Sequence, residues 1–178
     1  YEREFYKRLS NANWFIILKN KGVFNPTKNP STVQTENGFQ TPNWEPLSYL
    51  EKLSIQIKEG KELELIDEII EIIKKVSESS IKNDLTWVSF IKILSKLPNE
   101  KISKEILNLI PVWLNSNFNT RIQSMYLCDE LLPKFLYDHP IKEDIEKGEI
   151  ILKHLFSIEK KTEIEHDDLV FNKGSYYS

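Results

Sequence analysis

The chain has 178 residues, the size of one ordinary domain, and such a chain can bury roughly 70% of its unfolded surface without staples. Its 24 basic and 27 acidic side chains give a net charge of −3, which excludes the basic excess typical of nucleic-acid-binding proteins. A single cysteine, Cys128, excludes an internal disulfide, and no apolar run reaches the roughly 18 residues of a membrane span. We therefore expect a cytoplasmic protein that binds neither nucleic acid nor membrane.

The first predicted helix covers residues 2–20 and is interrupted near residues 11–13. Its apolar side chains are Phe5, Leu9, Ile16 and Ile17. Lys21 and Gly22 then supply the basic last turn and the glycine with which helices commonly end.

Residues 23–43 are rich in proline, threonine and asparagine, so we expect a long loop. Asn37-Gly38 within it could close a small hairpin. Three aromatic residues in and beside this loop are our candidate partner-binding residues, because aromatic anchors on a proline-stiffened backbone make good binding hot spots. They are Phe24, Phe39 and Trp44. The alternative is that they fold back and cover the end of the helical domain.

From residue 44 onward the helical pattern is regular. Pro46 suits a first helical turn, and the helix that follows ends at Glu59-Gly60. Its apolar side chains recur at spacings of three and four: Leu47, Leu50, Leu53 and Ile57. Residues 62–78 form a second amphipathic helix with one apolar stripe: Ile66, Ile69, Ile70, Ile73 and Val76.

The next helix starts at Asp84, a good N-terminal cap, and ends near Leu97-Pro98. Its buried face is Val88, Ile91 and Leu94. Either Asn99 or Ser103 opens the following helix, in which Pro111 predicts a kink. The apolar face of that helix is Ile106, Leu109, Ile110 and Trp113.

Two more helices complete the pattern. Thr120 can cap the first, in which Pro133 predicts a bend or an early end, and a break follows at residues 138–140. Its apolar side chains are Ile122, Met125, Tyr126, Leu132, Phe135 and Leu136. The last helix is interrupted only by Gly148, and its apolar side chains are Ile141, Ile145, Leu152, Leu155 and Phe156.

The sequence thus predicts an all-α protein of six or seven helices of about 13 to 20 residues with short connections, in which neighbours pack antiparallel. A compact helical bundle and a stack of helix pairs both satisfy this pattern. The recurrence of a tryptophan-bearing pair at roughly 36 to 40 residues favours the stack. The tryptophans concerned are Trp44, Trp87 and Trp113. We expect one helical domain over residues 1–157 and a polar tail, or a connection to a missing repeat, over residues 158–178.

Four segments resemble the HEAT-like α-helical repeat regions of large bacterial proteins, some of them suspected of antiviral defence. They read NWF (residues 13–15), LKNKGVFNP (18–26), TPNW (41–44) and LSYLEKL (47–53), and the resemblance extends over about residues 10–157. It implies a right-handed α-α superhelix of the HEAT or armadillo type. It also implies a scaffold or sensor region beside separate effector domains, and its motifs are packing motifs that carry no catalytic residue.

Candidate chemistry is sparse. The acidic tail could offer a metal site built from Glu163, Glu165, His166, Asp167 and Asp168, although charge runs of this kind are usually solvated. The spacing of Glu159-Lys160-Lys161, with Asp144 upstream, matches some nucleases but lacks the strand that such sites need. His139 and His154 stand alone, and we expect Cys128 to be a small core side chain. We therefore predict no catalytic, cofactor-binding or metal-binding residue.

The function predicted from the sequence is a non-catalytic protein-interaction scaffold, cut from a larger intracellular protein because the chain begins at Tyr1. Its partner would be a protein, a peptide or another domain of the parent chain. A regulatory region acting in cis on an enzymatic domain is the alternative, and a metal-dependent enzyme using residues 163–168 is a weaker one. We further expect the last helix to show an uncovered apolar stripe or to use it for a homodimer contact.

Overall fold

The computed structural model describes residues 2–28, 33–34, 40–41, 44, 46–79, 84–110, 124–137 and 139–157. The fold is all-α, as predicted. Its α-helices in chain order are α1 (Glu2–Arg8), α2 (Asn13–Asn20), α3 (Leu47–Lys58), α4 (Ile66–Glu78), α5 (Asp84–Leu94), α6 (Lys104–Leu107), α9 (Leu132–Leu136) and a helix over residues 142–157. Short 3-10 turns lie at Pro26–Lys28, Leu63–Leu65 and Asn99–Lys101, and a π-helical turn at Leu127–Leu131 runs directly into α9.

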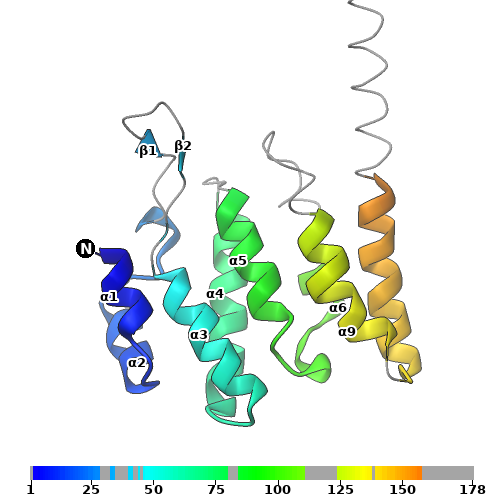
Figure 1. Cartoon of the computed structure of the whole chain (residues 1–178), viewed down its shortest axis with the longest axis horizontal. Helices are drawn as coiled ribbons and strands as arrows, with labels where there is room; N and C mark the ends of the chain where they lie inside the picture. Colours follow the sequence, from blue (N-terminus) through cyan, green and yellow to red (C-terminus); the bar gives the residue numbers. More distant parts are fainter. Residues whose placement is uncertain are drawn as a thin grey trace, which may run out of the picture.

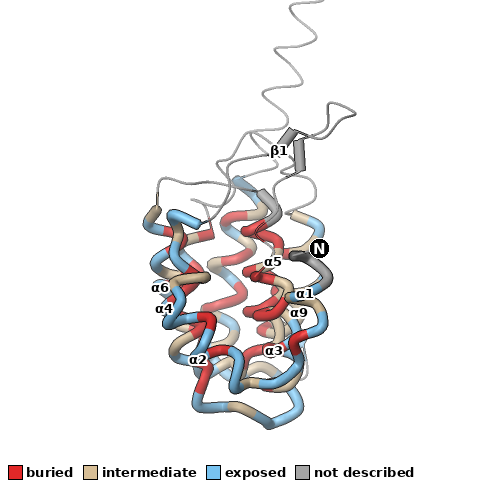
Figure 2. Tube along the Cα trace, turned by 90° about the vertical axis from the view of Figure 1, so that its left-hand side faces the viewer, coloured by how far each residue is buried: buried red, intermediate tan, exposed pale blue. Residues whose placement is uncertain are grey.

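The helices stand side by side in a row that follows the order of the chain, from α1 and α2 at one end to helix 142–157 at the other (Figure 1). Viewed along this row, α2, α4 and α6 lie on one side, whereas α1, α3, α5 and α9 lie on the other (Figure 2). The described helices therefore alternate between two layers, and the hydrophobic core runs between them.

The predicted first helix is two helices, and the break falls where the sequence places it. α1 ends at Arg8, and Asn13 opens α2, with its backbone N–H bonded to the side chain of Asn11. The break is held from α3, because the Tyr49 hydroxyl donates to the backbone oxygen of Asn11 at 2.9 Å and Gln56 donates to that of Ser10 at 2.6 Å. This tie fixes the first helix pair against the second.

Phe15 and Leu18 are the buried residues of α2, so the sequence pattern identified the helix but not its core face. Ile16 and Ile17, on which the prediction rested, are exposed, and so is Phe5 of α1. The interruption at residues 9–12 changes the helical phase, so the side chains before and after it do not continue one stripe.

The stripes predicted for α3 and α4 are confirmed. The buried side chains are Leu47, Leu50, Leu53 and Ile57 in α3, and Ile66, Ile69, Ile70, Ile73 and Val76 in α4. Gly60, with φ of +82°, takes the left-handed conformation just after α3, where a residue with a side chain would be strained. Its position agrees with the predicted end of that helix.

Helix α5 lies inside the row, between α3 and the helix that contains the π turn. Val88, Ile91 and Leu94 are buried as predicted, but Trp87, Phe90 and Ile93 are fully buried too. Only the side that carries Ser89 and Lys92 is partly exposed, so neighbours cover α5 over most of its circumference.

Ser103 caps α6, because its side chain accepts the backbone N–H of Ile106 at 3.4 Å, whereas Asn99 opens the preceding 3-10 turn. Several predictions concern side chains or residues outside the described part of the chain. They are the caps at Asp84 and Thr120, the kink at Pro111, and the placement of Trp113 and Ile122.

Pro133 does not end its helix, which continues to Leu136. Proline lacks the N–H that would bond the carbonyl of Asp129, and the five residues before α9 adopt a π-helical turn instead of a break. Within this stretch Leu127, Leu131 and Phe135 are fully buried, whereas Met125 is exposed. The helix then stops before residues 138–140, as expected.

The loop over residues 23–43 contains a two-stranded antiparallel ladder at the place considered for a hairpin. Strand β1 (Val33–Gln34) pairs with β2 (Gln40–Thr41), with Val33 opposite Thr41 and Gln34 opposite Gln40. The ladder lies above the row of helices in Figure 1.

Candidate functional site

Helix 142–157 carries a row of exposed apolar side chains beside a groove, so we describe it from its anchoring outward. It follows His139, whose φ of +60° reverses the chain after α9. It runs unbroken through Gly148, so the predicted interruption does not occur. One face is buried against the row, and the other faces outward.

Gly148 allows the helix to approach α9 closely. A Cβ at this position would lie 2.4 Å from Cδ2 and 2.8 Å from Cγ of Leu136, well inside van der Waals contact. Only glycine therefore fits without displacing Leu136. Ile151, one turn further along, is fully buried on the same side.

Lys147 is a buried cation that holds the helix to the 3-10 turn between α5 and α6. Its side chain is only 1% exposed, and its Nζ donates to the backbone oxygen of Asn99 at 2.8 Å. The same Nζ lies 3.0 Å from a carboxylate oxygen of Glu143, one turn earlier, and 5.9 Å from the centre of the Phe135 ring. A buried charge is stable only with such partners.

His154 is buried near the other end of this anchored face. Burial lowers the pKa of its imidazole, the charge of Lys153 lowers it further, and a hydrogen bond with the backbone of Leu107 partly offsets both. Its Nε2 has no hydrogen-bond partner among the residues that the structure describes. The neutral imidazole is therefore the form that the fold favours.

The outward face carries an apolar stripe, which we call the C-terminal stripe: Ile141, Ile145, Leu152 and Phe156. Ile141 is 64% exposed, Ile145 40% and Phe156 61%, so these side chains lack the cover that their type usually finds. This agrees with the expectation of an uncovered stripe on the last helix. The spacing of four, seven and four residues keeps all four members on one side of the helix.

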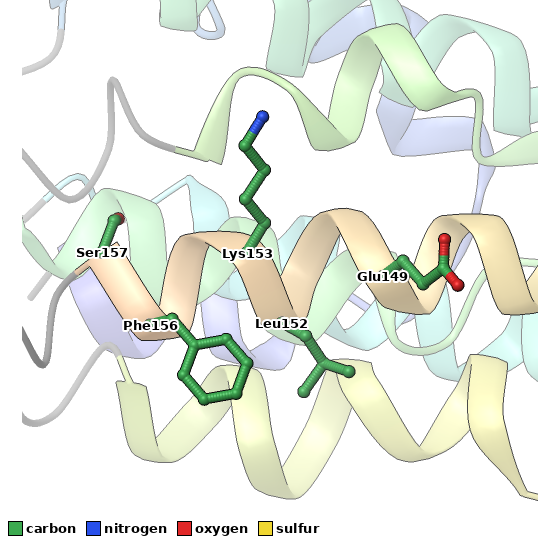
Figure 3. A pocket seen from close by; sticks show the side chains of 5 residues that line it. All are labelled: Glu149, Leu152, Lys153, Phe156 and Ser157. Atoms are coloured by element: carbon green, nitrogen blue, oxygen red, sulfur yellow. The ribbon is translucent and has the colours of Figure 1, made fainter.

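An open groove of 470 Å³ follows the second half of the stripe. Figure 3 shows Leu152 and Phe156 projecting from one side of the helix and Lys153 from the other. Glu149 and Ser157 are the further described residues that line the groove. The surface is thus apolar along its centre, with one acidic and one basic side chain beside it.

The structure places two of the three candidate partner-binding aromatics in the core, which corrects the idea of an exposed aromatic edge. Phe24 and Trp44 are each only 6% exposed. Phe24 stacks on Phe15 with ring centres 5.7 Å apart, so its ring closes the first helix pair instead of facing solvent. Phe39 lies outside the described residues.

Cys128 is exposed, which overturns its assignment to the core. Within the π turn, Leu127 and Leu131 take the inward positions and leave Cys128 outside. Partial burial raises the pKa of the thiol, and the neighbouring Asp129 raises it further, so the reactive thiolate is disfavoured.

The metal hypothesis concerned residues 163–168, which lie outside the described part of the chain, as do residues 159–161. Among the described residues no group of three or more His, Cys, Asp or Glu side chains is arranged to hold a metal ion. Of the described helices, none is both long and apolar enough to span a bilayer.

Comparison of the chain with protein-family models, with curated proteins and with solved structures returned no match in any of the three. The candidate site therefore rests on its own geometry. Sequence reasoning anticipated the exposed stripe but not the buried Lys147, because lysine is rarely fully buried and its partner, the Asn99 backbone oxygen, carries no sequence signal.

Proposed function

We propose that this chain is a non-catalytic protein-interaction scaffold. Its architecture would be a right-handed superhelix of the HEAT type, built as a stack of antiparallel helix pairs. The alternation of the described helices between two layers supports this architecture, because helical-repeat proteins stack their pairs in this way. The lone cysteine is compatible with the cytoplasm as its setting.

The observation that carries the proposal is the exposed C-terminal stripe. A helix buries its apolar face against another element, and contiguous exposed apolar surface commonly marks a binding site. Lys147 and Ile151 hold the buried face of the helix against the row, and Gly148, at the edge of the stripe, sets the close contact with α9, so the stripe is presented on a fixed backbone. A fixed surface loses little conformational entropy when a partner binds.

Site-specific photo-crosslinking in cells tests this proposal. A photoreactive phenylalanine analogue placed at Phe156 should give a discrete crosslinked protein on illumination. The matched control carries the same analogue at Ile55 of α3, which is about as exposed but lies within the row. We expect the crosslink at Phe156 and not at Ile55.

The identity of the crosslinked protein separates the forms of the proposal. A separate protein or a second copy supports a scaffold that acts in trans, whereas a crosslink within a longer parent chain supports the cis-regulatory alternative. No crosslink at Phe156, or equal crosslinking at both positions, would overturn the assignment of the stripe as a binding surface.

A further inference from the structure

We propose that the partner of the C-terminal stripe is the α1–α2 end of a second copy of this chain, so that copies join end to end. This inference rests on the proposed function and specifies its partner. It is carried by three observations: a second exposed apolar surface, its position, and its charge.

The second surface, which we call the N-terminal surface, consists of Phe5, Trp14, Ile16 and Ile17. All four side chains are exposed. Phe5 of α1 meets Trp14 of α2 edge to face, with ring centres 6.4 Å apart, so the two helices present one joint patch. Ile16 and Ile17 lie on the side of α2 away from its buried residues, Phe15 and Leu18.

The two surfaces lie at opposite ends of the row (Figure 1). Within the row each helix pair buries an apolar face against the next pair along the chain. A second copy whose α1 and α2 stand beside helix 142–157 would continue this packing and place α2 in the layer of α2, α4 and α6. Such a contact joins two different surfaces and is heterologous.

The charges of the two ends are complementary. Residues 2–28, which span α1 and α2, contain six basic and two acidic residues, a net charge of +4, and one of the basic side chains, Lys19, is ion-paired with Glu68 of α4. Residues 141–157 contain four acidic and three basic residues, a net charge of −1, and two of the acidic side chains are already ion-paired, Glu143 with Lys147 and Glu146 with Lys104. The acidic residues are Glu143, Asp144, Glu146 and Glu149, and the basic ones are Lys142, Lys147 and Lys153.

This charge pattern distinguishes end-to-end joining from a symmetric dimer. A symmetric contact would place basic against basic at the N-terminal surface, which is repulsive, or two ends of slightly negative net charge against each other at the C-terminal stripe, which brings no attraction. The heterologous contact brings opposite signs together. The attraction across the heterologous contact should weaken as salt is added, because at an ionic strength of 0.1 M charges more than about 10 Å apart are largely screened.

The expected contact is modest in size. A stable interface buries about 800 Å² on each partner, and four side chains from each end fall at the low end of that range. Association should therefore depend on concentration, and sedimentation velocity between about 5 and 500 µM covers the relevant range. Because a heterologous contact leaves one free surface at each end, the species should grow beyond the dimer.

Three double variants test the pairing without a change of charge. Ile16→Ser with Ile17→Ser removes the N-terminal surface, Ile145→Ser with Phe156→Ser removes the C-terminal stripe, and Ile55→Ser with Leu63→Ser is the control. All six side chains are between 40% and 61% exposed, so the fold should persist, and far-UV circular dichroism checks this.

Each end variant alone should be monomeric, whereas the control should associate like the unmodified chain. A mixture of the two end variants should form a 1:1 dimer that grows no further, because one intact stripe meets one intact N-terminal surface. High salt should weaken that dimer.

Three results would overturn the inference: a chain that stays monomeric throughout the concentration range, an end variant that still dimerises by itself, or a mixture that does not associate. If the chain is monomeric while Phe156 crosslinks to another protein, the end-to-end inference fails and the scaffold proposal stands. If neither occurs, both fail.

Discussion

Gly148 packs so closely against Leu136 that a Cβ would meet both Cδ2 and Cγ of the leucine. Because the branch carbon itself is in the way, rotation of a terminal methyl group does not make room. The contact sets the distance between α9 and helix 142–157, and hence the direction in which the C-terminal stripe faces.

Gly148→Ala should destabilise the protein. Overpacking costs about 1–3 kcal/mol, and the higher helix propensity of alanine returns about 1 kcal/mol, so we expect a net loss of about 1 kcal/mol. Urea denaturation measures the change. Adding Leu136→Ala should turn Gly148→Ala from destabilising to neutral or stabilising, and an unchanged cost in that background would contradict the proposed clash.

Lys147→Met should reduce the free energy of unfolding by about 1–3 kcal/mol, because the Asn99 backbone oxygen loses a charge-assisted donor in a buried place. Methionine keeps most of the apolar stem. Glu143→Gln is the informative comparison, since the Glu143 side chain is largely exposed and its ion pair is worth less than about 1 kcal/mol. Equal losses in the two variants would mean that the ion pair, not the Asn99 contact, matters.

His154 makes stability fall on the acid side of neutrality. Its pKa is lowered in the folded state, chiefly by burial, so below the unfolded value of about 6.5 the unfolded chain binds more protons than the folded one. Stability is therefore fully present above about pH 6.5 and declines as the pH falls from there toward the folded pKa.

Melting temperatures of the chain and of His154→Gln, measured from pH 8 to pH 5, test this. The unmodified chain should lose more stability than the variant over that range, because glutamine does not titrate. Parallel pH profiles would show that the imidazole is not held neutral by the fold.

The Tyr49 phenol should ionise only at high pH, and the stability of the fold should decrease as the pH rises toward its pKa. Burial raises the pKa of its phenol to about 12, partly offset by a backbone hydrogen bond at Phe15 and supported by the charge of Glu62. The unfolded phenol ionises near pH 10, so stability is present below that pH and falls by up to about 1.4 kcal/mol per pH unit until the folded group also ionises.

Tyrosinate absorbance should therefore show one component at about pH 12 that is absent from Tyr49→Phe. The same variant should cost about 0.5–1.5 kcal/mol at neutral pH, because the hydroxyl no longer donates to Asn11. Loss of the late component without any change in stability would argue against a structural role for this hydrogen bond.

Helical periodicity predicted the elements well where one face meets the core. Leu50, Leu53, Ile69 and Ile73 repeat at three and four residues and are all buried, since α3 and α4 each have polar residues to show solvent. The same rule could not identify α5 as an internal helix, because Phe90 and Ile93 fall outside the stripe that the rule selects.

The candidate site was predictable only in part. Ile145 and Phe156 stand out in the sequence, but whether an apolar stripe is covered depends on neighbours that local periodicity does not reveal. Cys128 was misplaced because a π turn shifts the helical phase by a residue. For Phe24, nothing local to its loop decides between an exposed ring and the fold-back that the structure shows, in which the ring stacks on Phe15.

The position of α5 inside the row, buried on most of its sides, also sets how the molecule opens. Amide hydrogens of α1 and helix 142–157 can exchange with solvent by fraying at the ends of the row, whereas those of α5 require its neighbours on both sides to part. Protection from exchange should therefore rise from both ends toward Trp87 and Phe90, which makes α5 the last segment to open under mild denaturing conditions.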